Sequence, residues 1–134
     1  MSACVLDTDV VIAALDRSDA HHRQAAEAIQ AMIADEVEML LSTVNYAEAL
    51  VRPAEDEETL KAAVDALAAL GVRPVPPTAA TARDAARYRS RNISLADGFA
   101  LATARARSAT VASFDRRVRR AMDELGFEAP FRNR

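Results

Sequence analysis

Four short apolar segments, separated by longer stretches of helical character, limit the possible folds of this chain more than any other feature. Each segment is bounded by turn-forming residues and is too short to be a buried helix, which favours strands. Strands that alternate with helices are typical of a parallel sheet covered by helices on both faces. The four predicted strands are ACVL (3–6), VEMLL (37–41), VRPV (72–75) and ATVA (109–112).

The stretches between and after these segments are rich in Ala, Leu and charged residues, and we predict that they are helices. Gly71 and Gly126 follow two of them in the position of a C-terminal cap. Right-handed crossovers then give an α/β fold, a three-layer α/β/α arrangement with a central parallel sheet of four or five strands. Because no linker or repeat divides the chain, we predict one domain over residues 1–134. The predicted helices cover residues 9–16, 20–35, 43–51, 56–70, 78–91, 94–107 and 115–125.

The composition indicates a folded protein of a reducing compartment. Apolar residues make up 51% of the chain, which is enough for a substantial core and argues against disorder. The single cysteine, Cys4, excludes an internal disulfide, and we expect a buried and unreactive thiol in the first strand. No signal-peptide pattern is evident, and no apolar run approaches the ~18 residues that a membrane span needs. We therefore expect a cytoplasmic protein that does not enter a membrane.

The net charge of −3 conceals an uneven distribution of charge along the chain. Residues 1–70 hold 14 acidic and 4 basic side chains, whereas residues 71–134 hold 6 acidic and 13 basic ones. All basic residues except Lys61 are arginines, which bind phosphate through a bidentate guanidinium and stack on bases. Most of these arginines are expected to lie on solvated helix faces, but the asymmetry also favours an anionic polymer as a partner.

Acidic residues from four separate places in the chain converge on one edge of the predicted sheet. Helices of such a fold begin at the carboxyl edge of the strands, where α/β proteins bind ligands. Asp7 directly follows the first strand, and Asp115 lies three residues past the fourth. Glu48 lies in the helix after the second strand, and Asp97 lies in the first turn of the helix that leads into the fourth. We therefore predict that these four carboxylates form one pocket.

Carboxylates gathered in this way repel one another, which raises their pKa values unless a positive charge lies among them. A divalent cation is the usual solution. Because no His or Cys lies at metal-binding spacing, oxygen donors of this kind favour Mg²⁺ or Mn²⁺ over Zn²⁺. Such an ion neutralises a phosphodiester, lowers the pKa of a bound water and stabilises the leaving oxygen. The pattern therefore predicts a site for a divalent cation at this edge of the sheet.

Most of these acids also have a purely structural explanation. Asp9 is a good helix N-cap, and we expect capping to be its main role. Ser94 and Asp97 form S-x-x-D, a variant of the capping box. Asp115 can cap the last helix, and Glu48 can be an exposed helix residue. Taken singly, each acid is therefore weak support for a metal site, and the argument depends on their number at one edge.

For Asp7, in contrast, no helix role and no partner is evident from the sequence. His21 and His22 lie at the start of a helix with a polar face, and we expect them to be surface residues. Tyr46 and Tyr88 are expected to pack against the core.

Four segments together resemble the acidic motifs of the PIN domain family, and most of all the VapC toxins of bacterial toxin–antitoxin pairs. The similarity covers essentially the whole chain in the right order. The intervals also fit, with 41 residues from Asp7 to Glu48 and 18 from Asp97 to Asp115. The segments are VLDTDVVIAAL (5–15), STVNYAEAL (42–50), SLADGFALATA (94–104) and VASFD (111–115).

The resemblance implies a single PIN-like nuclease domain that acts as a Mg²⁺-dependent endoribonuclease. Asp7, Asp97 and Asp115 would bind the ion directly or through water, and Glu48 would bind it or orient the attacking water. In-line attack should leave a 5′-phosphate and a 3′-hydroxyl. The supporting polar positions that match the family are Thr8, Asp9 and Ser113.

The resemblance also implies partners. These are an RNA substrate, a second copy of the chain in a homodimer, and a VapB-type antitoxin whose C-terminal segment wraps the toxin and blocks its pocket. Sequence choice would depend on unpaired bases of the RNA. The arginines that we predict to hold the RNA backbone are Arg87, Arg91, Arg116 and Arg117.

Two other functions fit parts of the sequence. D-x-D-x-V at residues 7–11 is a signature of haloacid-dehalogenase-type phosphatases, in which Asp7 would be the nucleophile and Asp9 the acid. That fold needs a lysine late in the chain, and none follows Lys61. A receiver domain needs the same lysine. A PIN-like module that binds RNA or protein without cleaving it is the other alternative, although the presence of all four acids argues against it.

Overall fold

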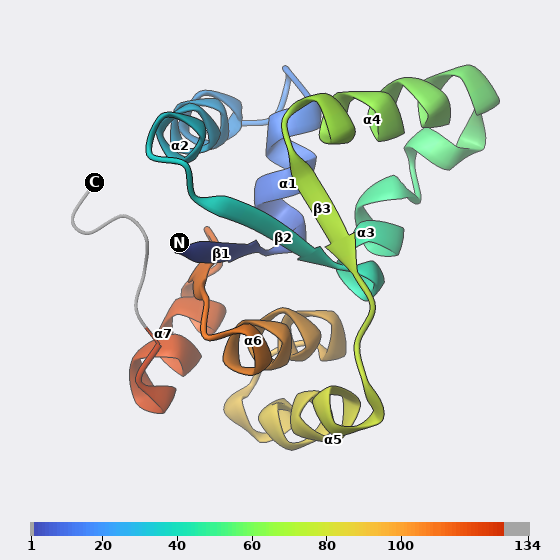
Figure 1. The fold of residues 1–134 in the computed structure, drawn as a ribbon. Coiled ribbons are helices and arrows are strands. Elements are labelled where there is room, and N and C mark those ends of the chain that lie inside the picture. The colour runs from blue at the N-terminus through green and yellow to red at the C-terminus, as the bar shows by residue number, and fades with distance from the viewer. Residues whose placement is uncertain (1, 128–134) are drawn as a thin grey trace.

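A computed structural model describes residues 2–127 of the chain and shows a parallel sheet at its centre (Figure 1). The sheet has four strands, β1 (Ala3–Leu6), β2 (Glu38–Ser42), β3 (Val72–Val75) and β4 (Thr110–Ala112). Their order in space is β3–β2–β1–β4, so the chain extends the sheet on one side of β1 and then crosses to the other side. The register pairs Cys4 with Met39 and Val5 with Val111.

Helices cover both faces of this sheet, which confirms the three-layer α/β/α prediction with four strands (Figure 1). The 3₁₀ helices η1 (Pro53–Glu55) and η2 (Arg89–Arg91) lie in the connections that follow α3 and α5. One layer contains α1 (Thr8–Leu15), α2 (His22–Ala34), α3 (Thr43–Leu50) and α4 (Glu57–Ala69), and the other contains α5 (Ala79–Tyr88), α6 (Leu95–Arg107) and α7 (Arg116–Leu125).

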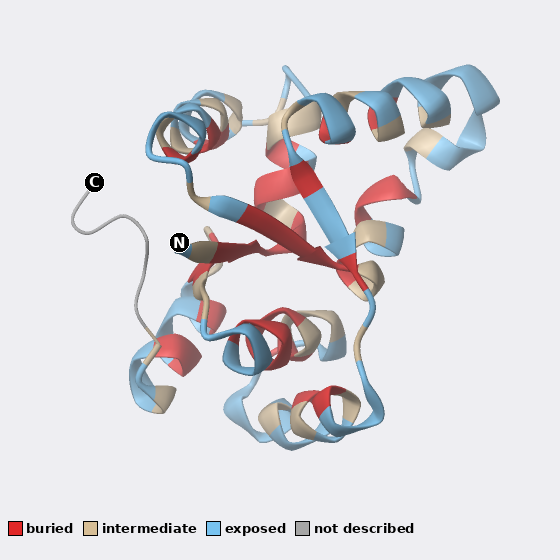
Figure 2. Ribbon diagram, in the orientation of Figure 1, coloured by how far each residue is buried: buried red, intermediate tan, exposed pale blue. Residues whose placement is uncertain are grey.

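Buried side chains form two core clusters, one on each face of the sheet (Figure 2). Leu6 and Leu41 belong to the cluster under α1 and α2, whereas Val5 and Leu40 belong to the cluster under α6 and α7. Because β1 and β2 are buried on both faces, consecutive residues must be apolar, which is why these strands are continuous apolar runs in the sequence.

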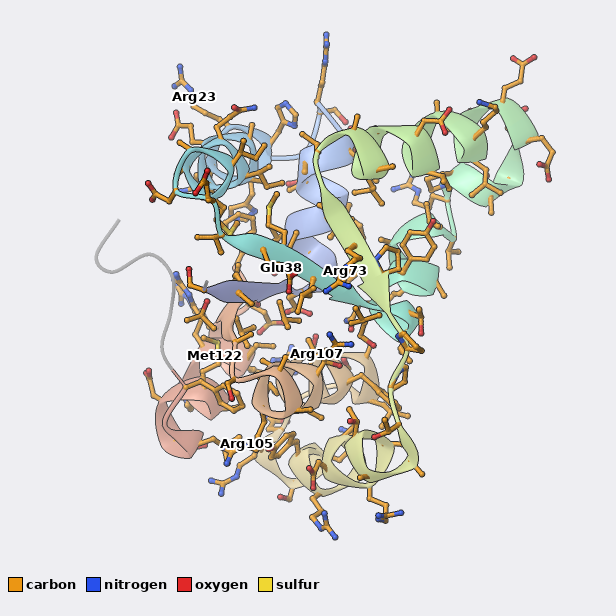
Figure 3. The ribbon with its side chains drawn as sticks, in the orientation of Figure 1. Arg23, Glu38, Arg73, Arg105, Arg107 and Met122 are labelled. Carbon is orange, nitrogen blue, oxygen red and sulfur yellow. The ribbon has the colours of Figure 1, made fainter. Side chains whose placement is uncertain are left out.

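Strand β3 forms one edge of the sheet and is more exposed than β1 and β2 (Figure 2). Pro74 stands in this strand although it has no backbone N–H to donate, which is tolerated at a sheet edge. The Arg73 guanidinium lies 3.2 Å from the Glu38 carboxylate of the neighbouring strand (Figure 3). This edge therefore combines a proline with a charged pair on its exposed face.

The helix ends agree with the predicted caps in most places. Gly71 and Gly126 adopt φ values of +82° and +80°, the left-handed conformation that a C-terminal glycine supplies. The helical segment predicted over 78–91 ends at Arg91 as expected, but it is α-helical only to Tyr88 and its last three residues form the 3₁₀ helix η2. Asn92 then adopts φ 61° and turns the chain toward α6. The two helices α5 and α6 pack closely at Gly98, where a Cβ would lie 2.7 Å from the Ala85 carbonyl oxygen.

Several smaller predictions can be compared directly with the structure. Cys4 is buried, and burial raises the pKa of its thiol to about 11, which keeps the unreactive protonated form. Tyr46 and Tyr88 pack against the two core clusters, as expected. His21 is exposed, but His22 is half-buried because its Nδ1 lies 2.7 Å from the Ala13 carbonyl oxygen. Within residues 2–127, none of the helices combines the length and the apolar character needed to cross a membrane.

Candidate active site

Asp7 lies where β1 ends and α1 begins, and its side chain is only 1% exposed. Its backbone N–H donates to the Ala112 carbonyl at 2.9 Å, which continues the pairing of β1 with β4 by one residue. Its Oδ1 accepts a hydrogen bond from the Thr8 N–H at 2.9 Å, and its Oδ2 accepts one from the Ser113 hydroxyl at 2.7 Å. Both carboxylate oxygens are therefore held in fixed positions by neighbours from opposite ends of the sequence.

The predicted N-cap role of Asp9 is wrong, because Asp7 caps α1. The helix begins at Thr8, directly after the strand, so Asp9 lies inside its first turn. Asp9 Oδ2 instead accepts a hydrogen bond from the Phe114 N–H at 3.1 Å, which ties α1 to the loop after β4. Asp9 Oδ1 is buried and has no hydrogen-bond partner among the described residues.

Asp97 and Asp115 both occupy helix N-termini, as their structural explanations predicted. Ser94 Oγ accepts a hydrogen bond from the Asp97 N–H at 3.1 Å, and Asp97 Oδ2 accepts one from the Ser94 N–H at 3.2 Å, which completes a capping box on α6. Asp115 caps α7 by accepting from the Arg117 N–H at 2.8 Å. Capping uses only part of each carboxylate, so it does not prevent a second role.

The four predicted acids and Asp9 line one open pocket of about 380 Å³ at the carboxyl edge of the sheet. Ser113 lies beneath this pocket and connects two of the acids, since its hydroxyl donates to Asp7 and accepts from the Asp115 N–H at 3.1 Å. Glu48 is exposed on α3 and also lines the pocket. The lining residues are Asp7, Thr8, Asp9, Ile12, Glu48, Asn92, Ile93, Ser94, Asp97, Asp115 and Arg117.

The pocket perturbs the ionisation of its two most buried acids. Burial, with the nearby charges of Asp9 and then Asp97, raises the pKa of Asp7 to about 8. Burial also raises the pKa of Asp9 to about 6, and the charge of Asp115 adds to this effect. Ionised carboxylates are therefore unfavourable at this site in the protein alone. A cation in the pocket would stabilise their ionised form.

The donor chemistry of the pocket fits a hard divalent cation such as Mg²⁺ or Mn²⁺. All the acidic ligands are carboxylate oxygens, and Asp9 Oδ1 offers a buried lone pair that no described residue uses. Residues 2–127 contain no group of three or more His, Cys, Asp or Glu side chains already arranged as a metal site. The acids share the pocket but do not enclose a cation, so water or substrate oxygens would have to complete its coordination.

Asn45 is part of the site although the sequence interpretation gave it no role. It is fully buried in α3, and its side-chain nitrogen donates to Thr8 Oγ1 at 2.9 Å and to the Ala96 carbonyl at 3.1 Å. It therefore connects the segments that carry Asp7 and Asp97. Asn45 lies one helical turn before Glu48, in a helix that is otherwise apolar on its buried face. That position is the signal from which the sequence could have identified it.

The predicted RNA-binding arginines separate into two groups. Arg117 lines the acidic pocket, and together with Arg91 it lines an adjacent pocket. Arg87 instead pairs with Asp84 on the exposed face of α5, and Arg116 lines neither pocket. Arg105, labelled in Figure 3, lies over the Phe127 ring at 5.0 Å and donates to the Leu125 carbonyl at 3.1 Å, so it supports the end of α7.

Comparison with known proteins gives consistent results for sequence and structure. Residues 4–124 match the PIN domain family. No significant match is found among curated proteins. Among solved structures, VapC20 of Mycobacterium tuberculosis, described as a sarcin–ricin loop cleaving toxin, superimposes with a TM-score of 0.70 at 19% identity, covering 93% of this chain and 96% of that one.

Two further solved structures share the fold. VapBC2 from Rickettsia felis, bound to a DNA fragment from its promoter, gives a TM-score of 0.68 at 15% identity and covers 89% of this chain and 92% of that one. FitAcB from Neisseria gonorrhoeae gives a TM-score of 0.61 at 24% identity and covers 90% of this chain and 93% of that one. At these identities the structural likeness is evidence of a shared fold.

Proposed function

This chain belongs to the PIN domain family, and we propose that it is a Mg²⁺- or Mn²⁺-dependent endoribonuclease, the toxin of a toxin–antitoxin pair. The observation that carries the proposal is the meeting of Asp7, Glu48, Asp97 and Asp115 in one pocket, although they come from four separate parts of the chain. The raised pKa of Asp7 supports the same interpretation, because perturbed acids cluster at sites of chemistry.

The residues suggest a division of roles. When bound, the ion would neutralise a phosphodiester and lower the pKa of an attacking water. Asp7 and Asp97 would hold it, with Asp115 as a third ligand directly or through water. Glu48, which is exposed at the pocket, would orient the attacking water and accept its proton at a carboxylate oxygen. Thr8 and Ser113 hold the two oxygens of Asp7 in place through their hydrogen bonds.

The neighbouring structures support the RNA class without selecting a particular target. VapC20 is described as a toxin that cleaves the sarcin–ricin loop. At 19% identity, however, the similarity shows a shared fold and does not identify the RNA that this chain cleaves. The phosphatase alternative is disfavoured, because Lys61 is the only lysine and is exposed on α4. A non-catalytic module would be the better interpretation only if the acids failed to support cleavage.

Substitution of Asp7 tests the proposal. We expect Asp7→Asn to abolish Mg²⁺-dependent cleavage of RNA while the protein stays folded. A matched control is Asp35→Asn, which makes the same change at an exposed position at the end of α2. Cleavage should be followed by sequencing of RNA ends, with the circular dichroism spectrum as a check on folding. An active, folded Asp7→Asn protein contradicts the proposal, and phosphate release from a small ester would favour the phosphatase.

We also propose a VapB-type antitoxin as the partner, whose C-terminal segment docks on an apolar groove beside the active site. This groove, of about 510 Å³, shares Ile12 and Glu48 with the acidic pocket, so a segment bound in it would reach the site. Val51 is 64% exposed at its rim, which is unusual for a large apolar side chain. The lining residues are Ile12, Leu15, Asp16, Glu48, Ala49, Val51, Arg52, Pro53 and Thr59.

The groove can be tested apart from catalysis. Val51→Lys is expected to weaken capture of the protein encoded directly upstream while RNA cleavage by the free enzyme is retained. The control Ile33→Lys changes another exposed apolar residue, on α2, that does not line the groove. Equal loss of capture in both variants would place the antitoxin elsewhere. Homodimerisation and a cytoplasmic location stay predictions, and sedimentation analysis tests the first.

A further inference from the structure

A second pocket of about 280 Å³ lies directly beside the acidic one, between η2 and α7. It differs from the acidic pocket in its charge, since three of its lining side chains are arginines and one is an acid. Arg120 is one of these arginines. The lining residues are Ser90, Arg91, Asn92, Arg117, Arg120 and Glu124. We call this group the arginine pocket.

The fold positions these side chains firmly. Arg117, Arg120 and Glu124 are spaced by three and four residues, so they share one face of α7. The opposite face of α7 is anchored in the core by Val118 and Met122. On the other wall, the left-handed Asn92 ends η2 and turns the chain back toward the site.

The same wall is held by a neighbouring arginine that does not line the pocket. The Arg89 guanidinium donates to the Ile93 carbonyl at 2.7 Å, which ties the start of η2 to the second residue after its end. The turn that carries Arg91 and Asn92 is therefore closed by a side-chain hydrogen bond. The pocket is thus built from a fixed turn and a packed helix.

The arginines of this pocket are only partly neutralised. Arg91 lies 3.6 Å from the Glu124 carboxylate, and both side chains are close to half exposed. Arg117 and Arg120 take part in none of the ion pairs formed within residues 2–127. The pocket therefore has an excess of positive charge, which favours an anion with several acceptor oxygens.

The two pockets are adjacent, because Asn92 and Arg117 line both of them. Carboxylates suited to a cation therefore lie next to guanidinium groups suited to an anion. A nucleic-acid strand with one phosphate at the acidic pocket carries its next phosphate one nucleotide further along. Resting on the function proposed above, we infer that the arginine pocket binds an RNA phosphate adjacent to the one that is cleaved.

Glu124 has a distinct role in this arrangement. Its carboxylate pairs with Arg91 in the protein without RNA, so it competes with a phosphate for that guanidinium group. The acid also places a negative charge beside the binding position. Glu124 therefore lowers the affinity for RNA, and removal of its charge should strengthen binding. Removal of an exposed negative charge elsewhere on the same helix should not strengthen binding.

Two matched pairs of variants test this inference in an Asp7→Asn background. The probe is a fluorescein-labelled, twelve-nucleotide single-stranded RNA of mixed sequence, and binding is followed by anisotropy over a range of salt concentrations. Arg120→Ala should weaken binding by about tenfold and lower the salt slope by about one, whereas Arg119→Ala, outside the pocket on the same helix, should have a much smaller effect. Glu124→Gln should tighten binding, and its neighbour Asp123→Asn should not.

Neutral linkages test the position of the bound phosphate. In these substrates, a methylphosphonate replaces the phosphate next to the cleaved bond, on its 5′ or its 3′ side. On one of the two sides the replacement should lower kcat/KM of the otherwise wild-type enzyme. The same replacement should not change kcat/KM of the variant that carries both Arg91→Ala and Arg120→Ala. The inference would be overturned if the two variants of each matched pair changed RNA binding equally. It would also be overturned if the neutral linkage still lowered kcat/KM of the double variant. Cleavage that persists in that case would leave the proposed nuclease intact. Absence of cleavage with the paired binding effects preserved would overturn the nuclease and retain the phosphate pocket.

Discussion

The side-chain amide of Asn45 donates a hydrogen bond to Thr8 Oγ1 at 2.9 Å, across 37 residues of sequence. The same nitrogen donates to the Ala96 carbonyl at 3.1 Å. Because Thr8 follows Asp7 and Ala96 precedes Asp97, one buried amide fixes the spacing between the two segments that carry these acids. Asn45 is thus a positioning residue for the site, acting through backbone and hydroxyl groups and not through contact with a substrate.

Replacement of Asn45 by leucine should damage the site more than the fold. The two side chains are similar in size, but leucine removes the hydrogen bonds of the Asn45 amide to Thr8 and Ala96, which is expected to lower the free energy of unfolding by about 1–3 kcal/mol. The metal affinity of the folded variant should also fall, as measured by titration calorimetry with Mn²⁺. Unchanged metal affinity in a destabilised but folded variant would show that Asn45 serves only the core.

The metal-free protein should lose stability as the pH rises from about 4 to about 8. The pKa of Asp7 is about 8 in the folded protein, whereas that of an unperturbed aspartate is 3.8. Between these pH values the folded state therefore keeps a proton that the unfolded state has released. Unfolding then releases a proton and is favoured by higher pH, and above about 8 the effect levels off. Asp9 acts in the same direction up to about pH 6.

Urea unfolding in EDTA at pH 5 and pH 8.5 measures this dependence. Asp7→Asn should remove most of it and should be more stable than the unsubstituted protein at pH 8.5, since no charge is then buried. The amide retains an oxygen for the Thr8 N–H, and the Ser113 hydroxyl can accept from its nitrogen. A pH slope identical in both proteins would mean that Asp7 is not the titrating group.

Addition of Mg²⁺ should reverse this loss. An ion that binds only the folded state stabilises it by about 2.7 kcal/mol at a concentration one hundred times its Kd. Because binding requires ionised carboxylates, the gain in Tm should be larger at pH 8 than at pH 6. Differential scanning calorimetry measures it, with Asp35→Asn expected to behave normally and Asp7→Asn to lose the gain. A gain of equal size in the Asp7 variant would place the ion elsewhere.

Replacement of Gly98 by alanine should destabilise the protein although alanine favours helices. In an exposed helix this change stabilises by about 1 kcal/mol, so the sign of the effect is diagnostic. Here the new Cβ would lie 2.7 Å from the backbone oxygen of Ala85, which forces α5 and α6 apart and is expected to cost about 1–3 kcal/mol. Thermal unfolding measures the change, and a stabilised variant would show that the two helices separate freely at this point.

The strands and most helices could be predicted because burial on both sheet faces leaves a plain signal. Val5 and Leu40 must be apolar on one face for the same reason that Leu6 and Leu41 must be on the other. The gathering of distant acids could also be predicted, since parallel topology alone brings strand ends to one edge.

Other features depend on contacts that a linear pattern does not contain. Capping chemistry allows either Asp7 or Asp9 to begin α1, and the choice depends on how directly the helix follows β1, which the residue pattern does not specify. The helical pattern marks Asn45 as a polar residue on a buried face, but it does not identify the partners of Asn45, which lie in segments far away in the sequence. The change from α5 to the 3₁₀ helix η2 was not predicted, because the sequence RSR (89–91) is compatible with either geometry, although Asn92 is a residue type that accepts φ 61° and ends the segment.

The exposed edge formed by β3 restricts how this molecule can associate with another copy. Backbone N–H groups of a strand alternate between its two sides, and Pro74 and Pro76 have none to offer. An incoming strand would therefore meet carbonyl oxygens at this edge with few N–H donors, and extension of the sheet at β3 is disfavoured. If two copies do assemble, they are therefore expected to use a surface other than this edge, which leaves β3 unpaired in the dimer as well.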